Sequence, residues 1–174
     1  LGVFRLGLGP VLEVPDADSM RTLGRRIAAV LRAGDLVLLG GELGAGKTTF
    51  AQGVGLGLGV RGPVTSPTFV IARVHPSLSR GPPLVHVDAY RLGGWDELED
   101  LDLEATLEQA VTVVEWGEGL AEGLGPDRLE VHIHRTEGAD SGEIREVRIR
   151  PAGNRWNGVN LQRSAGSPES RVRA

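Results

Sequence analysis

Cysteine is absent from the 174-residue sequence. A disulfide scaffold, a thiolate metal site and a cysteine nucleophile are therefore excluded. No apolar run approaches the roughly 20 residues that a membrane-spanning helix needs, so we expect no membrane segment. No basic block followed by an apolar stretch opens the sequence, so we expect no signal peptide. These absences fit a reduced, cytoplasmic setting.

Aromatic residues and lysine are also scarce. Aromatic residues make up 4% of the chain, and the formal net charge is −4 at pH 7. A mildly acidic chain is poorly suited to bind nucleic acid through its own surface. Lysine occurs once, as Lys47, and arginine provides the other 18 of the 19 basic residues. A lone lysine among arginines indicates a place that needs a compact point charge, such as a crowded phosphate site.

The length of the chain suits one domain, because a single core usually serves about 100–200 residues. Periodicity is lost from residue 151, where Gly, Ser, Asn and Arg dominate. We therefore predict a single domain over residues 1–150 and a disordered tail over residues 151–174.

The apolar pattern predicts short strands alternating with helices. Strands are expected at residues 11–14, 36–39, 68–74, 84–87, 111–114, 129–133 and 147–149. Wholly apolar runs among them are typical of parallel strands buried on both faces, whereas the last two alternate as an antiparallel pair does. Helices are expected over residues 20–31 behind a cap at Asp16 or Asp18, from Lys47 onward, and in the acid-rich segment 96–110.

Residues 41–48 fit the Walker A, or P-loop, pattern G-x-x-x-x-G-K-[ST] between an apolar strand and a helix. Glycines allow backbone N–H groups to curl around an anion, and the helix N-terminus adds partial positive charge. Lys47 would reach the β- and γ-phosphates, and Thr48 would offer its hydroxyl to Mg²⁺. The nucleotide-binding residues predicted here are Glu42, Leu43, Gly44, Ala45, Gly46, Lys47, Thr48 and Thr49. ATP is favoured over GTP, because the only lysine is used in this loop and none is left for a guanine-reading N/T-K-x-D motif.

Two acidic residues close buried strands. Asp88 follows residues 84–87, and Glu115 follows residues 111–114. The carboxyl ends of parallel strands meet at the P-loop edge of such a sheet. One acid could hold Mg²⁺ while the other orients or deprotonates the attacking water. Both assignments stay open at this level.

A Ser/Thr-Pro segment, Thr65–Phe69, lies one element after the P-loop helix. Loops that sense the γ-phosphate often occupy this position, which makes Thr68 a candidate; an ordinary proline turn is the alternative. His86 alternates with apolar neighbours, as a locally bonded core histidine does. His132 and His134 share a strand face without a third ligand, so we expect no metal site there.

Seven acidic residues occur without an intervening base. They are Asp96, Glu97, Glu99, Asp100, Asp102, Glu104 and Glu108. Such a run is typical of a solvated helix face, and the alternative is a docking surface for a basic partner.

The ordered set of motifs resembles the TsaE (YjeE) family, the small bacterial P-loop ATPases needed to form threonylcarbamoyladenosine in tRNA. The matching motifs are Gly-Glu-Leu-Gly-Ala-Gly-Lys-Thr-Thr-Phe at 41–50, Ser-Pro-Thr-Phe at 66–69, His-Val-Asp-Ala-Tyr-Arg-Leu at 86–92, Glu-Leu-Glu at 97–99 and Glu-Trp at 115–116. The resemblance covers roughly residues 14–149.

The resemblance implies an α/β fold: a P-loop NTPase-like, mostly parallel sheet flanked by helices, with an antiparallel C-terminal strand pair. It implies that Thr48, Asp88 and Glu115 surround Mg²⁺, that Thr68 belongs to a switch-like loop, and that Trp116 lies near the nucleotide. The catalytic residues would then be Lys47, Asp88, Glu115 and Thr68.

The resemblance also implies partners. ATP hydrolysis would support TsaD and TsaB, which transfer a threonylcarbamoyl group to the adenosine at tRNA position 37, next to the anticodon. The chain itself would meet tRNA only indirectly, through the complex. Ala89 stands where the family often has a larger apolar residue, which puts nothing catalytic in doubt.

A small-molecule or nucleoside kinase is the alternative function, because many kinases of this size carry the same loop. A kinase needs an acceptor pocket and usually an arginine-bearing lid. Arg91 is the only basic residue between Asp88 and Glu115 in the sequence, and the acidic run would repel an anionic acceptor. A nucleotide-gated binding module that hardly hydrolyses is a third class, and Glu115 argues against it.

Overall fold

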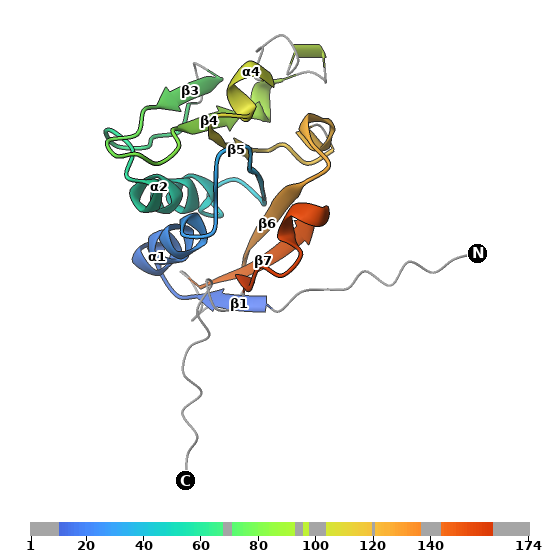
Figure 1. Ribbon diagram of the computed structural model, residues 1–174. Coiled ribbons are helices and arrows are strands. Elements are labelled where there is room, and N and C mark those ends of the chain that lie inside the picture. Colours follow the sequence, from blue (N-terminus) through green and yellow to red (C-terminus); the bar gives the residue numbers. More distant parts are fainter. Residues whose placement is uncertain are drawn as a thin grey trace, which may run out of the picture.

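The computed structural model describes residues 11–67, 71–92, 96–97, 104–119, 121–136 and 144–161. Seven strands of this part form one sheet in the order β1-β7-β6-β2-β5-β4-β3 (Figure 1). Their bounds are Val11–Val14 (β1), Leu36–Gly40 (β2), Ala72–His75 (β3), Leu84–Asp88 (β4), Val111–Glu115 (β5), Arg128–Arg135 (β6) and Arg145–Ala152 (β7).

Helices are fewer and mostly short. Their bounds are Ala17–Ala28 (α1), Lys47–Leu58 (α2) and Glu104–Leu107 (α4), with 3₁₀ turns at Ala89–Arg91 (η1), Ala121–Leu124 (η2) and Asn154–Trp156 (η3). None of the helices in the described part of the chain has the length and apolarity needed to span a bilayer.

The sheet combines a parallel centre with antiparallel margins. Strand β2 pairs in parallel with both β5 and β6, and β4 pairs in parallel with β5. Strands β6 and β7, β7 and β1, and β3 and β4 pair antiparallel. The predicted α/β class, with a parallel core and an antiparallel C-terminal pair, is confirmed. The central strands are buried along their whole length, as their continuous apolar sequences require.

Helices α1 and α2 cover one face of the sheet, and α1 packs against α2, the helix that follows the P-loop. Met20, Leu23 and Ile27 of α1 are buried in the larger of two apolar clusters. The two helices approach closely, because a Cβ at Gly24 or Gly53 would clash with the backbone of the other helix. The glycine content of α2 therefore serves this close packing, in addition to any role in the loop.

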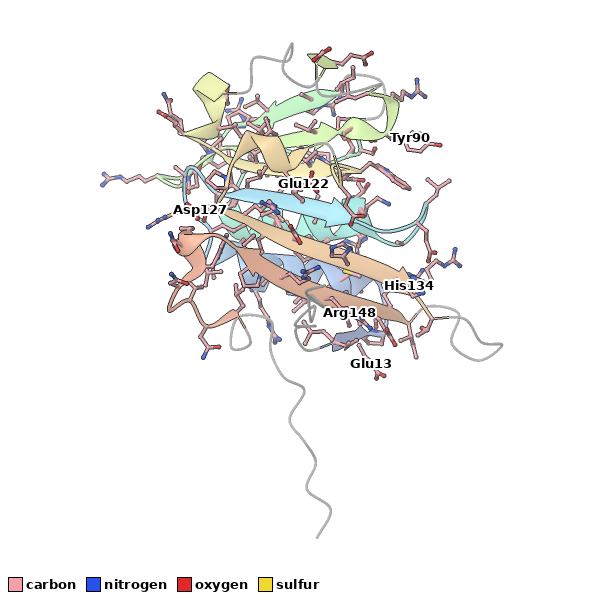
Figure 2. The ribbon with its side chains drawn as sticks, turned by 90° about the vertical axis from the view of Figure 1, so that its right-hand side faces the viewer. Glu13, Tyr90, Glu122, Asp127, His134 and Arg148 are labelled. Carbon is pink, nitrogen blue, oxygen red and sulfur yellow. The ribbon has the colours of Figure 1, made fainter. Side chains whose placement is uncertain are left out.

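Within the described part of the chain, the opposite face is covered over only part of its width. A smaller apolar cluster on β2, β4 and β5 packs beneath α4 and the turns η1 and η2. The outer faces of β1, β6 and β7 instead carry polar side chains, among them Glu13, His134 and Arg148 (Figure 2). The expectation of flanking helices thus holds fully on one face, whereas short elements cover the other.

Several predicted boundaries shift by a few residues. The first helix begins at Ala17, because Asp16 caps it by accepting a hydrogen bond from Ser19 N at 2.7 Å. The strand predicted at 68–74 is observed over Ala72–His75, and residues 68–70 lie outside the described part. The acid-rich segment is described only at residues 96–97 and from residue 104 onward.

The predicted disordered tail is wrong for residues 151–161. Strand β7 continues to Ala152, and the turn η3 brings Trp156 into the core with 5% of its surface exposed. Arg155 forms a bidentate ion pair with the buried Asp35, with both N–O distances 2.8 Å. One tryptophan and one arginine anchor this segment, and two isolated residues leave no periodic signal. Residues 162–174 lie outside the described part.

Candidate phosphate-binding site

The loop between β2 and α2 has the backbone shape that glycine makes possible. Gly41, Gly44 and Gly46 have φ values of 131°, 76° and 113°, in the region that residues with a Cβ rarely adopt. Gly46 is the N-cap of α2 and provides no side chain to cap it. The first N–H groups of α2 therefore face the hollow of the loop, as an anion-binding helix start requires.

Lys47 is buried at the first position of α2, with 4% of its surface exposed. Its Nζ donates hydrogen bonds to Gly41 O at 2.7 Å and to Glu42 O at 2.8 Å. The same Nζ lies 3.6 Å from the centroid of the Trp116 ring. Two carbonyl oxygens and an aromatic face thus hold the lone lysine beside the loop.

Burial and neighbouring charges act on Lys47 in opposite directions. Desolvation lowers the pKa of Lys47, and the carboxylates of Glu115, Asp88, Glu118 and Glu42 partly oppose this shift. Four carboxylates thus act on one ammonium group, a surplus of negative charge that a divalent metal carried by a nucleotide would offset.

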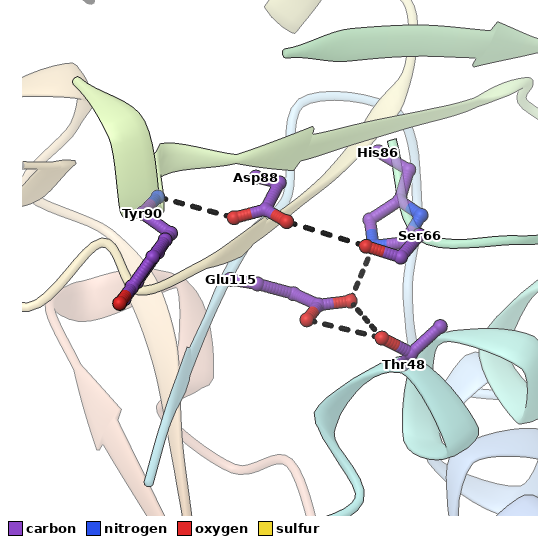
Figure 3. A network of polar contacts seen from close by, with 6 residues as sticks. All are labelled: Thr48, Ser66, His86, Asp88, Tyr90 and Glu115. Atoms are coloured by element: carbon purple, nitrogen blue, oxygen red, sulfur yellow. Dashed lines mark hydrogen bonds and ion pairs between the residues drawn. The ribbon is translucent and has the colours of Figure 1, made fainter. Parts of the chain in front are cut away.

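The Thr48 hydroxyl connects the P-loop helix to β5. Thr48 Oγ1 donates to the carboxylate of Glu115, with distances of 2.9 Å to Oε1 and 3.1 Å to Oε2 (Figure 3). The same Oε1 lies 2.8 Å from Nε2 of His86, which is fully buried on β4. Glu115 itself is 3% exposed. The carboxylate is therefore held from two sides at the end of its strand.

Asp88 lies beside Glu115, because the two residues are partners in the parallel β4–β5 ladder. Its Oδ1 accepts a hydrogen bond from Tyr90 N at 3.1 Å, and its Oδ2 accepts one from Ser66 Oγ at 3.2 Å (Figure 3). Asp88 is 7% exposed. The two strand ends thus present both predicted carboxylates at one place, as the sequence indicates.

The oxygen donors at this place suit a magnesium ion. Two carboxylates and the Thr48 hydroxyl are hard ligands, and Mg²⁺ is usually bound by one or two carboxylates together with water and substrate phosphates. No group of three or more His, Cys, Asp or Glu side chains suited to a metal occurs in the described part of the chain. Asp88 and Glu115 suit a metal that arrives with a nucleotide and keeps phosphate and water among its ligands.

Trp116 follows Glu115 directly and has an unusual backbone. Its φ of 61° is left-handed, a conformation that costs a bulky residue roughly 1–3 kcal/mol. Its N–H donates to Leu39 O at 3.1 Å, and its ring packs at 5.1 Å from the ring of Tyr90, which is 63% exposed. The strained residue thereby places an aromatic ring over Lys47.

The structure adds two residues to those that the sequence nominates. The first is Ser66, which contacts Asp88. In that loop the sequence nominates Thr68, and Thr68 lies outside the described part. His86 is buried as expected, yet its partner is Glu115 on the neighbouring strand. The signal available in the sequence is the spacing of two between His86 and Asp88, which puts both side chains on the same face of β4.

The exposed histidine face of β6 has a different arrangement. His132 Nδ1 lies 2.9 Å from Glu118 Oε1, and the two side chains are 40% and 50% exposed. Glu118 packs directly against Gly40 at the end of β2. This pair borders the loop, but it lies apart from the contacts of Thr48, Asp88 and Glu115.

Comparisons with known proteins give matches over most of the chain. The family model described as "Threonylcarbamoyl adenosine biosynthesis protein TsaE" matches residues 14–145. A tRNA threonylcarbamoyladenosine biosynthesis protein TsaE from Streptomyces coelicolor is 63% identical over 148 residues, which cover 84% of this chain and 100% of the relative. The protein of the same name from Mycobacterium tuberculosis is 47% identical over 146 residues, 79% of this chain and 87% of the relative. The crystal structure of YdiB from Bacillus subtilis superposes with a TM-score of 0.66 at 32% identity, covering 85% of this chain and 88% of that one.

Proposed function

The chain belongs to the TsaE family, and from this premise we propose that it is a Mg²⁺-dependent ATP hydrolase required to form threonylcarbamoyladenosine at position 37 of tRNA. The single observation that carries the proposal is the contact between Thr48 and Glu115. It joins the P-loop helix to an acidic strand end, which is the arrangement that Mg·nucleotide hydrolysis needs.

The loop residues bind and orient the phosphates in this proposal. Lys47 exchanges its hydrogen bonds to Gly41 O and Glu42 O for the β- and γ-phosphates. The N–H groups at the start of α2 bind the same anion, aided by the partial positive charge of the helix end. Because Lys47 lies beneath the Trp116 ring, this exchange brings the phosphate chain next to the ring.

Thr48, Asp88 and Glu115 would hold Mg²⁺, which when bound offsets the negative charge of the β- and γ-phosphates. We assign Asp88 mainly to the metal and Glu115 to both the metal and the attacking water. A positioned carboxylate that accepts the proton of that water contributes about 10²–10⁴-fold in rate. Thr68 is proposed to sense the γ-phosphate from the adjacent loop.

A hollow on the far side of the loop would take the ribose and base. It is lined by Asp16, Ala17, Met20, Gly44, Ala45, Gly46, Thr49 and Arg145. Thr49 follows Thr48 on the helix and therefore faces away from the carboxylates, which is where the non-reacting end of the nucleotide must leave. Arg145 Nε donates to Ala45 O at 3.1 Å and so fixes one wall of this hollow to the loop.

The chain is proposed to act with TsaD and TsaB and to be slow alone. The residues assigned above supply one lysine, a metal site and two carboxylates, so a basic group from a partner would complete the stabilisation of transition-state charge. The paired rings of Tyr90 and Trp116 suit a partner contact, because an exposed aromatic residue beside charged ones is typical of binding hot spots.

Phosphate release assays test the proposal against the kinase alternative. Release from ATP is measured alone and with a panel of small metabolites and nucleosides, with the Lys47→Ala variant as the inactive control. We expect Mg²⁺-dependent release of inorganic phosphate that no metabolite redirects. Transfer of the phosphoryl group to one of those acceptors would establish a kinase instead.

A further inference from the structure

His86 is a buried histidine whose two ring nitrogens differ: within the described part of the chain one has a hydrogen-bond partner and the other has none. It is fully buried in the middle of β4, and its Nε2 lies 2.8 Å from Glu115 Oε1. Its Nδ1 has no hydrogen-bond partner within the described part of the chain. Since β4 and β5 are adjacent parallel strands, this contact joins one strand to the next, from a residue two positions before Asp88.

The absence of a described partner for Nδ1 indicates which of the two ring nitrogens carries the proton. A neutral imidazole has one N–H donor and one acceptor, and a carboxylate can only accept. If Nδ1 carried the proton, a buried donor would lack a partner and two acceptors would face each other at 2.8 Å. The neutral ring with hydrogen on Nε2 satisfies Glu115 and leaves only an acceptor without a partner.

A glutamate carboxylate depends on its neighbours for its orientation. Its last torsion is broad, so the strand alone does not fix the plane of the two oxygens. In the structure Thr48 Oγ1 and His86 Nε2 both donate to Glu115 and define this plane. In the proposed function the Thr48 oxygen would also serve Mg²⁺, so His86 Nε2 would be the donor to Glu115 that the metal does not share.

We infer that His86 is a positioning residue for Glu115: its Nε2–H fixes the orientation of the carboxylate from the β4 side. The inference rests on the proposed function, because it assumes that Glu115 serves a metal nucleotide. His86 itself touches neither nucleotide nor water in this assignment. Removing its donor should therefore lower kcat while leaving KM for ATP close to that of the wild type.

Three substitutions separate the effect of losing the hydrogen-bond donor from the effect of altered packing. His86→Gln keeps an N–H donor about as far along the side chain, whereas His86→Leu and His86→Phe fill the space without one. We expect kcat to fall roughly 10–100-fold in the two donor-free variants, the range found when second-layer partners of metal ligands are removed. The Gln variant should recover most of this loss. Equal kcat in the Gln, Leu and Phe variants would overturn the inference.

A matched control uses the other buried histidine. His75 is 4% exposed at the end of β3, where it pairs with Leu84 at the opposite end of β4 from Asp88. His75→Leu should lower thermal stability without the selective loss of kcat. If the donor-free His86 variants do not fold, the Gln variant decides alone, because a folded His86→Gln protein with a kcat reduced 10-fold or more contradicts the inference.

Nuclear magnetic resonance of the imidazole nitrogens gives a readout that needs neither metal nor hydrolysis. In the metal-free wild-type protein we expect the neutral His86 ring to carry its proton on Nε2, with a downfield Nε2–H signal that shifts in Glu115→Gln. A proton on Nδ1 would overturn the inference. If instead the wild type shows this signal but hydrolyses no ATP, the proposed function fails and the contact between His86 and Glu115 stands.

Discussion

The ammonium group of Lys47 lies 3.6 Å from the centre of the Trp116 ring, and that ring packs at 5.1 Å against the exposed ring of Tyr90. The lysine of the P-loop motif is therefore connected to the protein surface through two aromatic side chains. A ligand that binds Lys47 changes the surroundings of the Trp116 ring, and a partner that contacts Tyr90 acts on the same pair of rings.

Replacement of Lys47 tests whether the site needs a point charge. Lys47→Ala should abolish tight ATP binding, and Lys47→Arg should also fail. The ammonium fits between Gly41 O, Glu42 O and the Trp116 ring, where a planar guanidinium is too large. Calorimetric titration with Mg·ATP measures the effect, and an Arg variant with wild-type affinity would show that the point-charge argument is wrong.

Neutralising each strand-end acid should give different results. Asp88→Asn should raise the Mg²⁺ concentration needed for hydrolysis, because Asp88 is assigned mainly to the metal. Glu115→Gln should leave nucleotide binding largely intact and lower turnover by about 10²–10⁴-fold. Mg²⁺ titrations of phosphate release and of nucleotide binding separate the two effects. Full activity in both variants would remove both assignments.

The stability of the protein should depend on His75 at mildly acidic pH. Burial lowers the pKa of His75 below its usual value near 6.5, so the folded state favours the neutral ring. The resulting stability is complete above pH 6.5 and is lost as the pH falls through the lower pKa of the folded state. Thermal unfolding at several pH values should show a steeper loss for the wild type than for His75→Gln. Parallel curves would assign the acid sensitivity elsewhere.

The ion pair between Arg155 and Asp35 should be a stability determinant. Arg155→Ala leaves the carboxylate of Asp35, which is 4% exposed, without its bidentate partner. Such a loss costs about 3–5 kcal/mol in the free energy of unfolding. Arg148→Ala is the control, because the half-buried Arg148 on β7 lies 3.9 Å from Glu146, in an ion pair worth less than about 1 kcal/mol. Urea unfolding that shows equal losses would contradict the assignment.

The sequence predicts the parallel core and the strand-end acids because these depend on local pattern. Apolar runs identify β2, β4 and β5, whose C-terminal ends are expected at the P-loop edge, so the sequence predicts that Asp88 and Glu115 share this edge. The β4–β5 register of the structure then sets the two residues side by side. The glycines of the loop are equally informative, because a positive φ leaves few other residues possible.

Contacts between distant residues could not be predicted in the same way. The bond from His86 to Glu115 depends on strand order and register, which one sequence does not reveal. The prediction of a disordered tail fails just after residue 150, because the anchors Arg155 and Trp156 are single residues in a polar stretch. A role for Thr68 and docking through the acidic run stay predictions, because Thr68 and most of that run lie outside the described part.

The most direct test of the proposed function measures phosphate release from Mg·ATP by the wild type and by Glu115→Gln, each with and without TsaD and TsaB. We predict slow release by the wild type alone and clear stimulation by the two partners, though smaller than the roughly 10³–10⁵-fold known for GTPases that receive an arginine from a partner. Glu115→Gln should remain slow in both conditions. Stimulated release that is the same in the wild type and in Glu115→Gln would contradict the account.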